Sequence, residues 1–388
     1  MLMKQKLPQT LTTEWKRICA FGFSLLIVFN IFFTFLWPLD RPLQWLLQAG
    51  LIWLWVSSRV YRYLELNRSS SQRPKSAVFD QLGWANRLTI LRGFLIAVTG
   101  GFIFQRNLDN FILIIPALSY FIAAIIDRID GYVARKSGQE SLLGSKLDVE
   151  NDALGLLIAP LLAVWIGQIH WSYLSVSLAY YFFQYGLFWR KQRNLPVFEL
   201  PLNMSRRAIA GFQMGFLAVV LWPILAPPAS TIAGIAFMIP LLGGFYIDWL
   251  TVSGRLNPED SRVKLIFLHI DNFFRNIFIP LLRIFIISMV YFSLQSNGAF
   301  TFGAEAESGT VILAVTILFA AIMITLGVNG RFFAVILSCL LAWFFLSHPM
   351  NFLDALMLVS VIWVMQLGTG GFSLYRWDDK WVNRYDGA

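Results

Sequence analysis

The chain has 388 residues, of which 57% are hydrophobic and only 14% are charged. Soluble globular domains carry about 25% charged residues, so this composition excludes that class and indicates an integral membrane protein. The formal net charge of +9 is expected to set topology and to contact anionic lipid headgroups, and no nucleic-acid partner is predicted.

Apolar runs long enough to cross a bilayer as helices recur along the whole chain. The first two lie at 18–38 and 43–58, and a polar linker at 65–81 follows them. Six closely spaced runs come next, at 84–104, 111–126, 150–167, 172–189, 208–225 and 230–250. After a second linker, four more lie at 273–295, 310–327, 332–347 and 352–369.

This order predicts an all-α polytopic membrane protein in three blocks. Residues 1–81 would hold a lead-in and two anchoring helices, and residues 82–252 a six-helix core. Residues 253–388 would form a four-helix membrane domain of unknown role. Lys and Arg gather in one set of loops, which predicts that these loops and both termini lie on the cytoplasmic side of a cell (inner) membrane.

Four aspartates interrupt the apolar pattern between the fourth and fifth runs. Asp127 and Asp130 are three residues apart at the end of one predicted helix, and Asp148 and Asp152 are four apart at the start of the next. Such spacings put side chains on one helix face, so two antiparallel helices would direct all four carboxylates into one pocket. Carboxylates at a membrane helix end are costly unless paired, solvated or bound to a cation. An all-oxygen set favours Mg²⁺ or Mn²⁺ and leaves positions for water and substrate phosphate.

The stretch DRIDGYVARKSGQESLLGSKLDVEND, residues 127–152, fits the signature D-x2-D-G-x2-A-R-x8-G-x3-D-x3-D at every fixed position. It therefore resembles the CDP-alcohol phosphatidyltransferase family, and NRLTILR at 86–92 is similar to an element of that family's first helix. The resemblance implies an enzyme of phospholipid biosynthesis. It would transfer a phosphatidyl group from CDP-diacylglycerol to an alcohol acceptor and release CMP.

The resemblance also implies a role for each matching residue. Asp127, Asp130 and Asp148 would hold a pair of divalent ions, with Asp152 beside them as a further metal ligand and as the catalytic base. The CDP part of the donor would be bound by residues of both motifs, namely Asn86, Thr89, Arg92, Gly131, Ala134, Arg135 and Gly144. Members of the family often dimerise through their core helices, so a homodimer is also expected.

The motifs leave the acceptor alcohol open. Arg206 and Arg207 begin a predicted helix on the cytoplasmic side, where two guanidinium groups suit a phosphorylated acceptor such as glycerol 3-phosphate. In family members that make phosphatidylglycerol phosphate, this helix resembles K-x-K-T-x-x-Q. Alignment on Gln213 puts Ile209 and Ala210 in place of the second lysine and the threonine. Inositol phosphate, phosphatidylglycerol, serine and other alcohols therefore stay open, as does a role of the two arginines in topology alone.

Two further features bear on the alternatives. Acids in membrane helices also occur in ion-coupled transporters, the rival class, but these acids cluster at one face of the membrane and not near its midplane. The last block resembles DoxX-type membrane proteins in its four helices and its closing GTGGFSL segment. Arg283 lies inside a predicted helix of this block, and we expect an ion pair with Asp271 or Asp354 to stabilise it.

Overall fold

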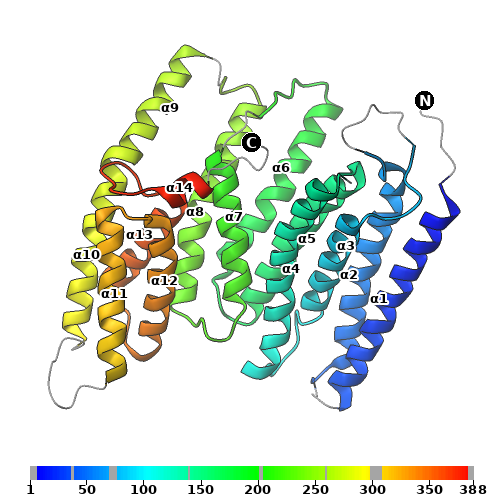
Figure 1. Ribbon diagram of the computed structural model, residues 1–388, viewed down its shortest axis with the longest axis horizontal. Coiled ribbons are helices and arrows are strands. Elements are labelled where there is room, and N and C mark those ends of the chain that lie inside the picture. The colour runs from blue at the N-terminus through cyan, green and yellow to red at the C-terminus, as the bar shows by residue number, and fades with distance from the viewer. Residues whose placement is uncertain are drawn as a thin grey trace. The chain divides into compact units, whose positions relative to one another are not determined.

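The computed structural model describes residues 7–35, 39–69, 77–138, 140–200, 204–257, 260–297 and 308–382. Within these ranges all regular secondary structure is helical, and β pairing is limited to two isolated bridges. Figure 1 shows the helices along the chain. The predicted all-α class is confirmed for this part of the chain.

The chain divides into two compact units. The first comprises Met1–Gly167 and Met214–Pro223, and the second comprises Gln168–Gln213 and Ile224–Ala388. This division does not follow the three predicted blocks at 1–81, 82–252 and 253–388. The block boundaries therefore stay a prediction from the sequence.

The first unit is built around its third long helix. Its helices are α1 (Gln9–Phe35), α2 (Pro42–Tyr63), the 3₁₀ helix η1 (Leu64–Leu66), α3 (Trp84–Gly100), α4 (Asn110–Ser137) and α5 (Leu142–Trp165). Helix α3 packs against α2, α4 and α5, and most of its residues are buried. Gly93 permits this close packing, since a Cβ there would lie 2.7 Å from Cγ1 of Val56. The buried face of α3 therefore meets both helices that carry the aspartates.

The ends of α4 and α5 place the four aspartates near one another. Helix α4 ends at Ser137, and Gly138 follows it with a φ of 63°, a left-handed conformation that glycine adopts without a steric penalty. Helix α5 begins after Ser141, whose side chain caps it by accepting a hydrogen bond from the backbone N–H of Gly144. The short turn between them brings the end of one helix beside the start of the next.

The second unit holds the remaining helices. They are η2 (Trp171–Tyr173), α6 (Leu174–Gln192), α7 (Met204–Val220, whose end belongs to the first unit), α8 (Ala229–Val252), α9 (Ser261–Phe273), the π-helix η3 (Phe274–Phe278), α10 (Ile279–Ser296), α11 (Ser308–Leu326), α12 (Gly330–Ser347), α13 (Phe352–Leu367) and α14 (Trp377–Val382). Helix α13 packs against α8, α10 and α12, and α11 packs against α10 and α12. These contacts bury an apolar core within the unit.

The expected ion pair of Arg283 with Asp271 or Asp354 is wrong. Asp354 instead caps the start of α13 together with Asn351. The guanidinium of Arg283 donates hydrogen bonds of 2.5–3.2 Å to Ser373 Oγ and to the backbone carbonyls of Ile324, Thr325, Thr369, Gly371 and Phe372. These carbonyls lie near the end of α11 and after α13, where a helix leaves carbonyls without their usual partners, and one arginine offers them five N–H groups.

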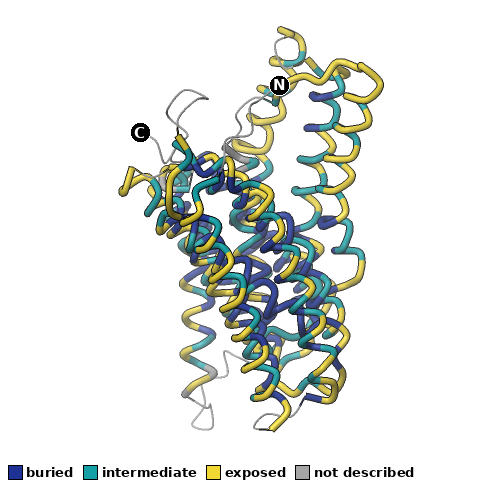
Figure 2. The backbone as a smooth tube through the Cα atoms, turned by 90° about the vertical axis from the view of Figure 1, so that its right-hand side faces the viewer, coloured by how far each residue is buried: buried dark blue, intermediate teal, exposed yellow. Residues whose placement is uncertain are grey.

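Long apolar helices with exposed hydrophobic side chains identify the chain as an integral membrane protein. Among the described residues, five helices are long and apolar enough to cross a membrane, namely Gln9–Phe35, Asn110–Ser137, Ala229–Val252, Ser261–Ser296 and Gly330–Ser347. Figure 2 shows exposed residues along the length of the helices and not only at their ends. Phe21 is 64% exposed and Ile31 is 52% exposed, a pattern that suits lipid better than water. The other predicted spans stay predictions.

Candidate active site

Three of the predicted metal ligands converge in the first unit. Asp127 of α4 and Asp148 and Asp152 of α5 each offer a carboxylate oxygen, and these oxygens lie within 4.8 Å of one another. Asp148 and Asp152 are one helical turn apart and share a face of α5. Hard divalent cations bind carboxylate oxygens at about 2.0–2.6 Å, so oxygens gathered this closely fit such an ion.

Asp130 lies outside this three-carboxylate cluster. Its side chain is buried, and its Oδ2 lies 2.8 Å from Oγ1 of Thr89, a residue of α3. Oγ1 of Thr89 also lies 3.0 Å from the carbonyl oxygen of Ala85, so its single proton serves two acceptors. The sequence placed all four acids in one set, whereas α3 holds Asp130 by a separate hydrogen bond.

Arg92 provides the positive charge among the three clustered carboxylates. Its Nη1 lies 2.6 Å from Oδ1 of Asp127 and 2.8 Å from Oδ1 of Asp148, and its Nη2 forms an ion pair with Asp152. The guanidinium is almost completely buried, because α3 passes between the two helices that carry the acids. The sequence predicted a donor-binding role for Arg92, but its contacts are with predicted metal ligands.

A pocket of about 250 Å³ opens beside these acids. Predicted metal ligands and predicted donor-binding residues line it together, namely Asn86, Thr89, Asp130, Gly131, Ala134, Arg135, Gly144 and Asp148. Gly131 leaves space at the wall, and a Cβ there would lie 3.4 Å from Nη1 of the exposed Arg135. The lining therefore combines acids, small residues and one accessible guanidinium, the groups that a nucleoside diphosphate with bound cations requires.

Gly144 lets α5 approach α3 at the wall of this pocket. A Cβ on Gly144 would lie 2.7 Å from Oδ1 of Asn86 and 3.2 Å from Oγ of Ser141. Ser141 donates a hydrogen bond of 2.9 Å to that same Oδ1, so the glycine makes room for a buried polar contact between the two helices. A larger side chain would have to displace the Asn86 amide.

Comparison with known proteins identifies this part of the chain. Residues 82–246 match the family model described as CDP-alcohol phosphatidyltransferase. The chain carries a CDP-alcohol phosphatidyltransferase domain. Members of this family are CDP-alcohol phosphotransferases and generally depend on divalent metal ions, so the match supports an enzyme whose domain at residues 82–246 passes a phosphatidyl group from a CDP-alcohol to an alcohol. The searches of curated proteins and of solved structures gave no match.

The predicted acceptor residues of the CDP-alcohol phosphatidyltransferase domain belong to the second unit. Arg206 at the start of α7 forms an ion pair of 2.8 Å with Asp248 of α8. The side chain of Arg207 lies outside the described residues. Gln213, on which the acceptor motif was aligned, is buried and donates a hydrogen bond to the hydroxyl of Tyr173. The acceptor assignment therefore stays a prediction.

Two polar residues at the site of the CDP-alcohol phosphatidyltransferase domain escaped sequence reasoning. Asn151 is buried, and its Nδ2 donates a hydrogen bond of 2.7 Å to the carbonyl oxygen of Thr89, which ties α5 to α3. It stands between Glu150 and Asp152, so its polarity gave no signal that set it apart in the sequence. Ser141 was also missed, although a serine at the start of a helix is a familiar N-cap signal.

Proposed function

We propose that the chain transfers the phosphatidyl group of CDP-diacylglycerol to an alcohol and releases CMP on the cytoplasmic side of a cell membrane. The observation that carries this proposal is the pocket of about 250 Å³, whose lining joins Asp130 and Asp148 to residues of both donor motifs. A transporter would need no such combination of donor-motif residues beside its acids. The lining thus favours the transferase over the ion-coupled carrier.

The proposed cofactor is Mg²⁺ or Mn²⁺, with two ions per site. Oxygens of Asp127, Asp148 and Asp152 lie within 4.8 Å of one another and would hold one ion. Asp130 shares the pocket lining with Asp148 and would help to hold the second. When bound, such ions stabilise negative charge on the departing phosphate and make the phosphorus under attack more electrophilic.

The side chains of this chain would bind the donor and move one proton. Gly131 and Ala134 leave room at the pocket wall, and the exposed guanidinium of Arg135 suits a diphosphate oxygen. Asp152 would accept the proton of the acceptor hydroxyl. The acceptor oxygen then forms a bond to the lipid-linked phosphorus, while the bond from that phosphorus to the bridging oxygen breaks and CMP leaves with the electron pair.

Glycerol 3-phosphate is the proposed acceptor. Support comes from Arg206 and Arg207 at the start of α7, since paired guanidinium groups bind phosphate well. Arg206 is already engaged by Asp248, so an acceptor phosphate would share or replace that carboxylate. Inositol phosphate, phosphatidylglycerol, serine and unphosphorylated alcohols are the alternatives for the same chemistry.

Purified protein in detergent, given labelled CDP-diacylglycerol and Mg²⁺ or Mn²⁺, tests this function directly. We expect CMP release that requires an acceptor, and a lipid product that identifies the acceptor. Asp127→Asn and Asp152→Asn should each lower the rate by roughly 100-fold or more, because each removes a charged ligand or the base. The exposed Asp271 of α9 supplies the control, and Asp271→Asn should leave the rate unchanged.

The outcomes separate the chemistry from the acceptor. Unchanged CMP release by Asp127→Asn and Asp152→Asn would show that the proposed site is wrong. If glycerol 3-phosphate gives no product while another alcohol does, the acceptor proposal fails and the transfer reaction stands. No acceptor-dependent CMP release with any alcohol would overturn the proposed function as a whole.

A further inference from the structure

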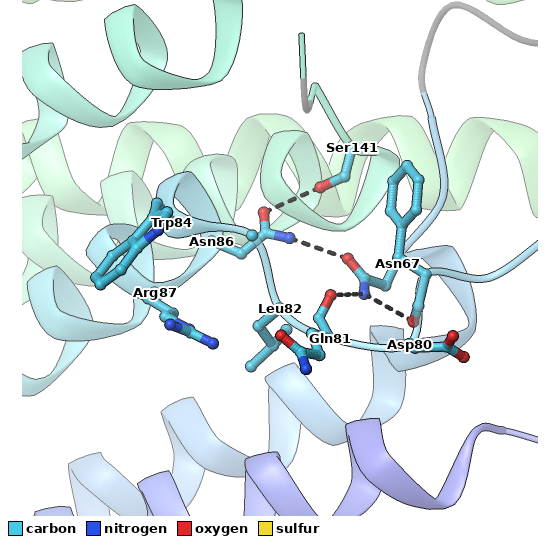
Figure 3. A pocket seen from close by; sticks show the side chains of 10 residues that line it. Asn67, Asp80, Gln81, Leu82, Trp84, Asn86, Arg87 and Ser141 are labelled. Atoms are coloured by element: carbon cyan, nitrogen blue, oxygen red, sulfur yellow. Dashed lines mark hydrogen bonds between the residues drawn. The ribbon is translucent and has the colours of Figure 1, made fainter. Parts of the chain in front are cut away.

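Asn67 lies outside the matched domain, yet its side chain is hydrogen-bonded to Asn86, which lines the donor pocket. It follows η1 in the segment that joins α2 to α3, whereas the family match begins at residue 82. Although this linker is polar in sequence, the side chain of Asn67 is completely buried. Figure 3 shows its amide facing Asn86 of α3 on one side and the backbone around Gln81 on the other.

The hydrogen bonds of Asn67 fix which way its amide points. Its Nδ2 lies 3.0 Å from the carbonyl oxygen of Gln81 and 3.4 Å from that of Phe79. Only an NH₂ group can donate to two carbonyl oxygens, so the Oδ1 of Asn67 must face Asn86, whose Nδ2 lies 3.0 Å away. The orientation of one buried amide is thereby set by the backbone of the linker.

The same constraint passes to Asn86. Because its NH₂ group faces Asn67, its Oδ1 faces Ser141, whose hydroxyl donates a hydrogen bond of 2.9 Å. One Nδ2 hydrogen of Asn86 is used by Asn67, and the second has no acceptor among the described residues. Asn86 lines the donor pocket and also the neighbouring pocket of about 350 Å³ drawn in Figure 3. A hydrogen-bond donor of known orientation therefore stands at the wall of both.

The linker around Asn67 is held against α5 by its own backbone. The N–H of Leu142, the first residue of α5, donates a hydrogen bond of 3.1 Å to the carbonyl oxygen of Arg68. The N–H of Phe79 donates a hydrogen bond of 2.8 Å to the carbonyl oxygen of Asn67. The backbone of Asn67 is thus fixed between α5 and the residues that lead into α3. If the Asn86 amide rotated, Asn67 could not move to keep its hydrogen bond with it.

We propose that Asn67 is a positioning residue for the CDP-linked donor and acts by holding the Asn86 amide in one orientation. The proposal rests on the proposed function, and it extends the donor site into the N-terminal segment that precedes the family domain. Without the oxygen of Asn67, only the Ser141 hydroxyl fixes the Asn86 amide, and that hydroxyl oxygen can instead accept a hydrogen bond from an amide rotated by 180°. The rotated amide would then present an acceptor where the donor substrate meets an N–H group.

A double-mutant cycle tests this role. Asn67→Leu should raise the KM for CDP-diacylglycerol on the order of fivefold, the loss expected for one buried hydrogen bond, while kcat stays within about twofold. Asn86→Ala should raise the same KM. Adding Asn67→Leu to Asn86→Ala should then produce no further rise, because Asn67 acts through Asn86. If Asn67→Leu does not fold, Asn67→Ser, which keeps a small polar group, gives the same comparison.

Gln105 supplies the matched control. It is also buried, and its Nε2 donates a hydrogen bond of 3.1 Å to the carbonyl oxygen of Arg41, which joins α2 to the residues beyond the other end of α3. Gln105→Leu should lower thermal stability, though less than Asn67→Leu because it removes one hydrogen bond and not three, and should leave the KM for CDP-diacylglycerol unchanged. CMP affinity, measured by calorimetry, should fall only in the Asn67 variant.

Three results would overturn the proposal. The first is an unchanged KM for CDP-diacylglycerol in Asn67→Leu. The second is a rise in this KM when Asn67→Leu is added to Asn86→Ala that equals the rise in the wild-type background. The third is a rise in this KM in Gln105→Leu as large as that in Asn67→Leu, which would mean that the fold is loosened in general. Each requires an active wild-type protein. A wild-type protein without CMP release is a different outcome, since it removes the proposed function itself.

Discussion

At the residue scale, α3 divides the four aspartates between two environments. Arg92 forms ion pairs with Asp127, Asp148 and Asp152, whereas Asp130 is held by Thr89. Three carboxylates this close repel one another unless a cation stands among them. Arg92 supplies one such positive charge, and the proposed divalent ion would contact the same carboxylates.

Removing the charge of Arg92 should therefore make stability depend on divalent ions. We expect Arg92→Leu to lose roughly 3 kcal/mol of stability without metal. This is the low end for a broken buried pair, since the Asp148 and Asp152 side chains are 47% and 38% exposed. Added Mg²⁺ should raise the melting temperature of Arg92→Leu much more than that of the wild type. Thermal unfolding in detergent, with and without Mg²⁺, measures both.

Arg92→Lys is the control for this comparison because it keeps the charge and loses the fork of donors. It should respond to Mg²⁺ nearly as the wild type does. Equal stabilisation of Arg92→Leu and the wild type by Mg²⁺ would mean that ion and guanidinium do not serve the same acids.

At the element scale, the crossing of α3 and α5 depends on a glycine at the pocket wall. Gly144→Ala would bring a Cβ to 2.7 Å from Oδ1 of Asn86, so the amide must move and its hydrogen bond with Ser141 breaks. We expect a loss of about 1–3 kcal/mol in stability, as for other overpacked sites, together with a higher KM for CDP-diacylglycerol. Steady-state kinetics and thermal unfolding check the two effects.

Gly243 in α8 is the matched control for Gly144. A Cβ there meets no atom within 4 Å, so Gly243→Ala has free space and gains helix propensity. It should leave the KM unchanged and keep or slightly raise the melting temperature. A Gly144→Ala protein with wild-type KM and stability would contradict the close approach of the two helices.

At the scale of the whole molecule, the proposed topology can be tested together with the proposed metal. The basic loops predict that the acids open to the cytoplasm. In sealed membrane vesicles, EDTA, which does not cross lipid, should abolish CMP release only where the cytoplasmic face is outward. Excess Mg²⁺ should restore it. Inhibition confined to vesicles of the opposite orientation would reverse the topology, and no inhibition in either would contradict the metal requirement.

The sequence by itself determined the helical class and the membrane setting, and it predicted the aspartate site. These follow from local quantities, because the length of an apolar run indicates a span and spacings of three and four place side chains on one helix face. Asp127, Asp130, Asp148 and Asp152 were therefore predicted as one set before any packing was known, and the structure clusters three of them, leaving Asp130 outside.

Only the tertiary structure decided which groups these residues meet. Arg92 turns to the acids because α3 packs against both α4 and α5, a choice that no spacing within one helix encodes. Arg283 donates hydrogen bonds to backbone carbonyls and forms no ion pair with Asp271 or Asp354, because the end of α11 and the segment after α13 lie around its guanidinium. Asn67 reaches Asn86 across 19 positions of sequence, and nothing in a polar linker predicts a buried amide. Contacts of this kind depend on how helices pack, and packing is a property of the assembled fold.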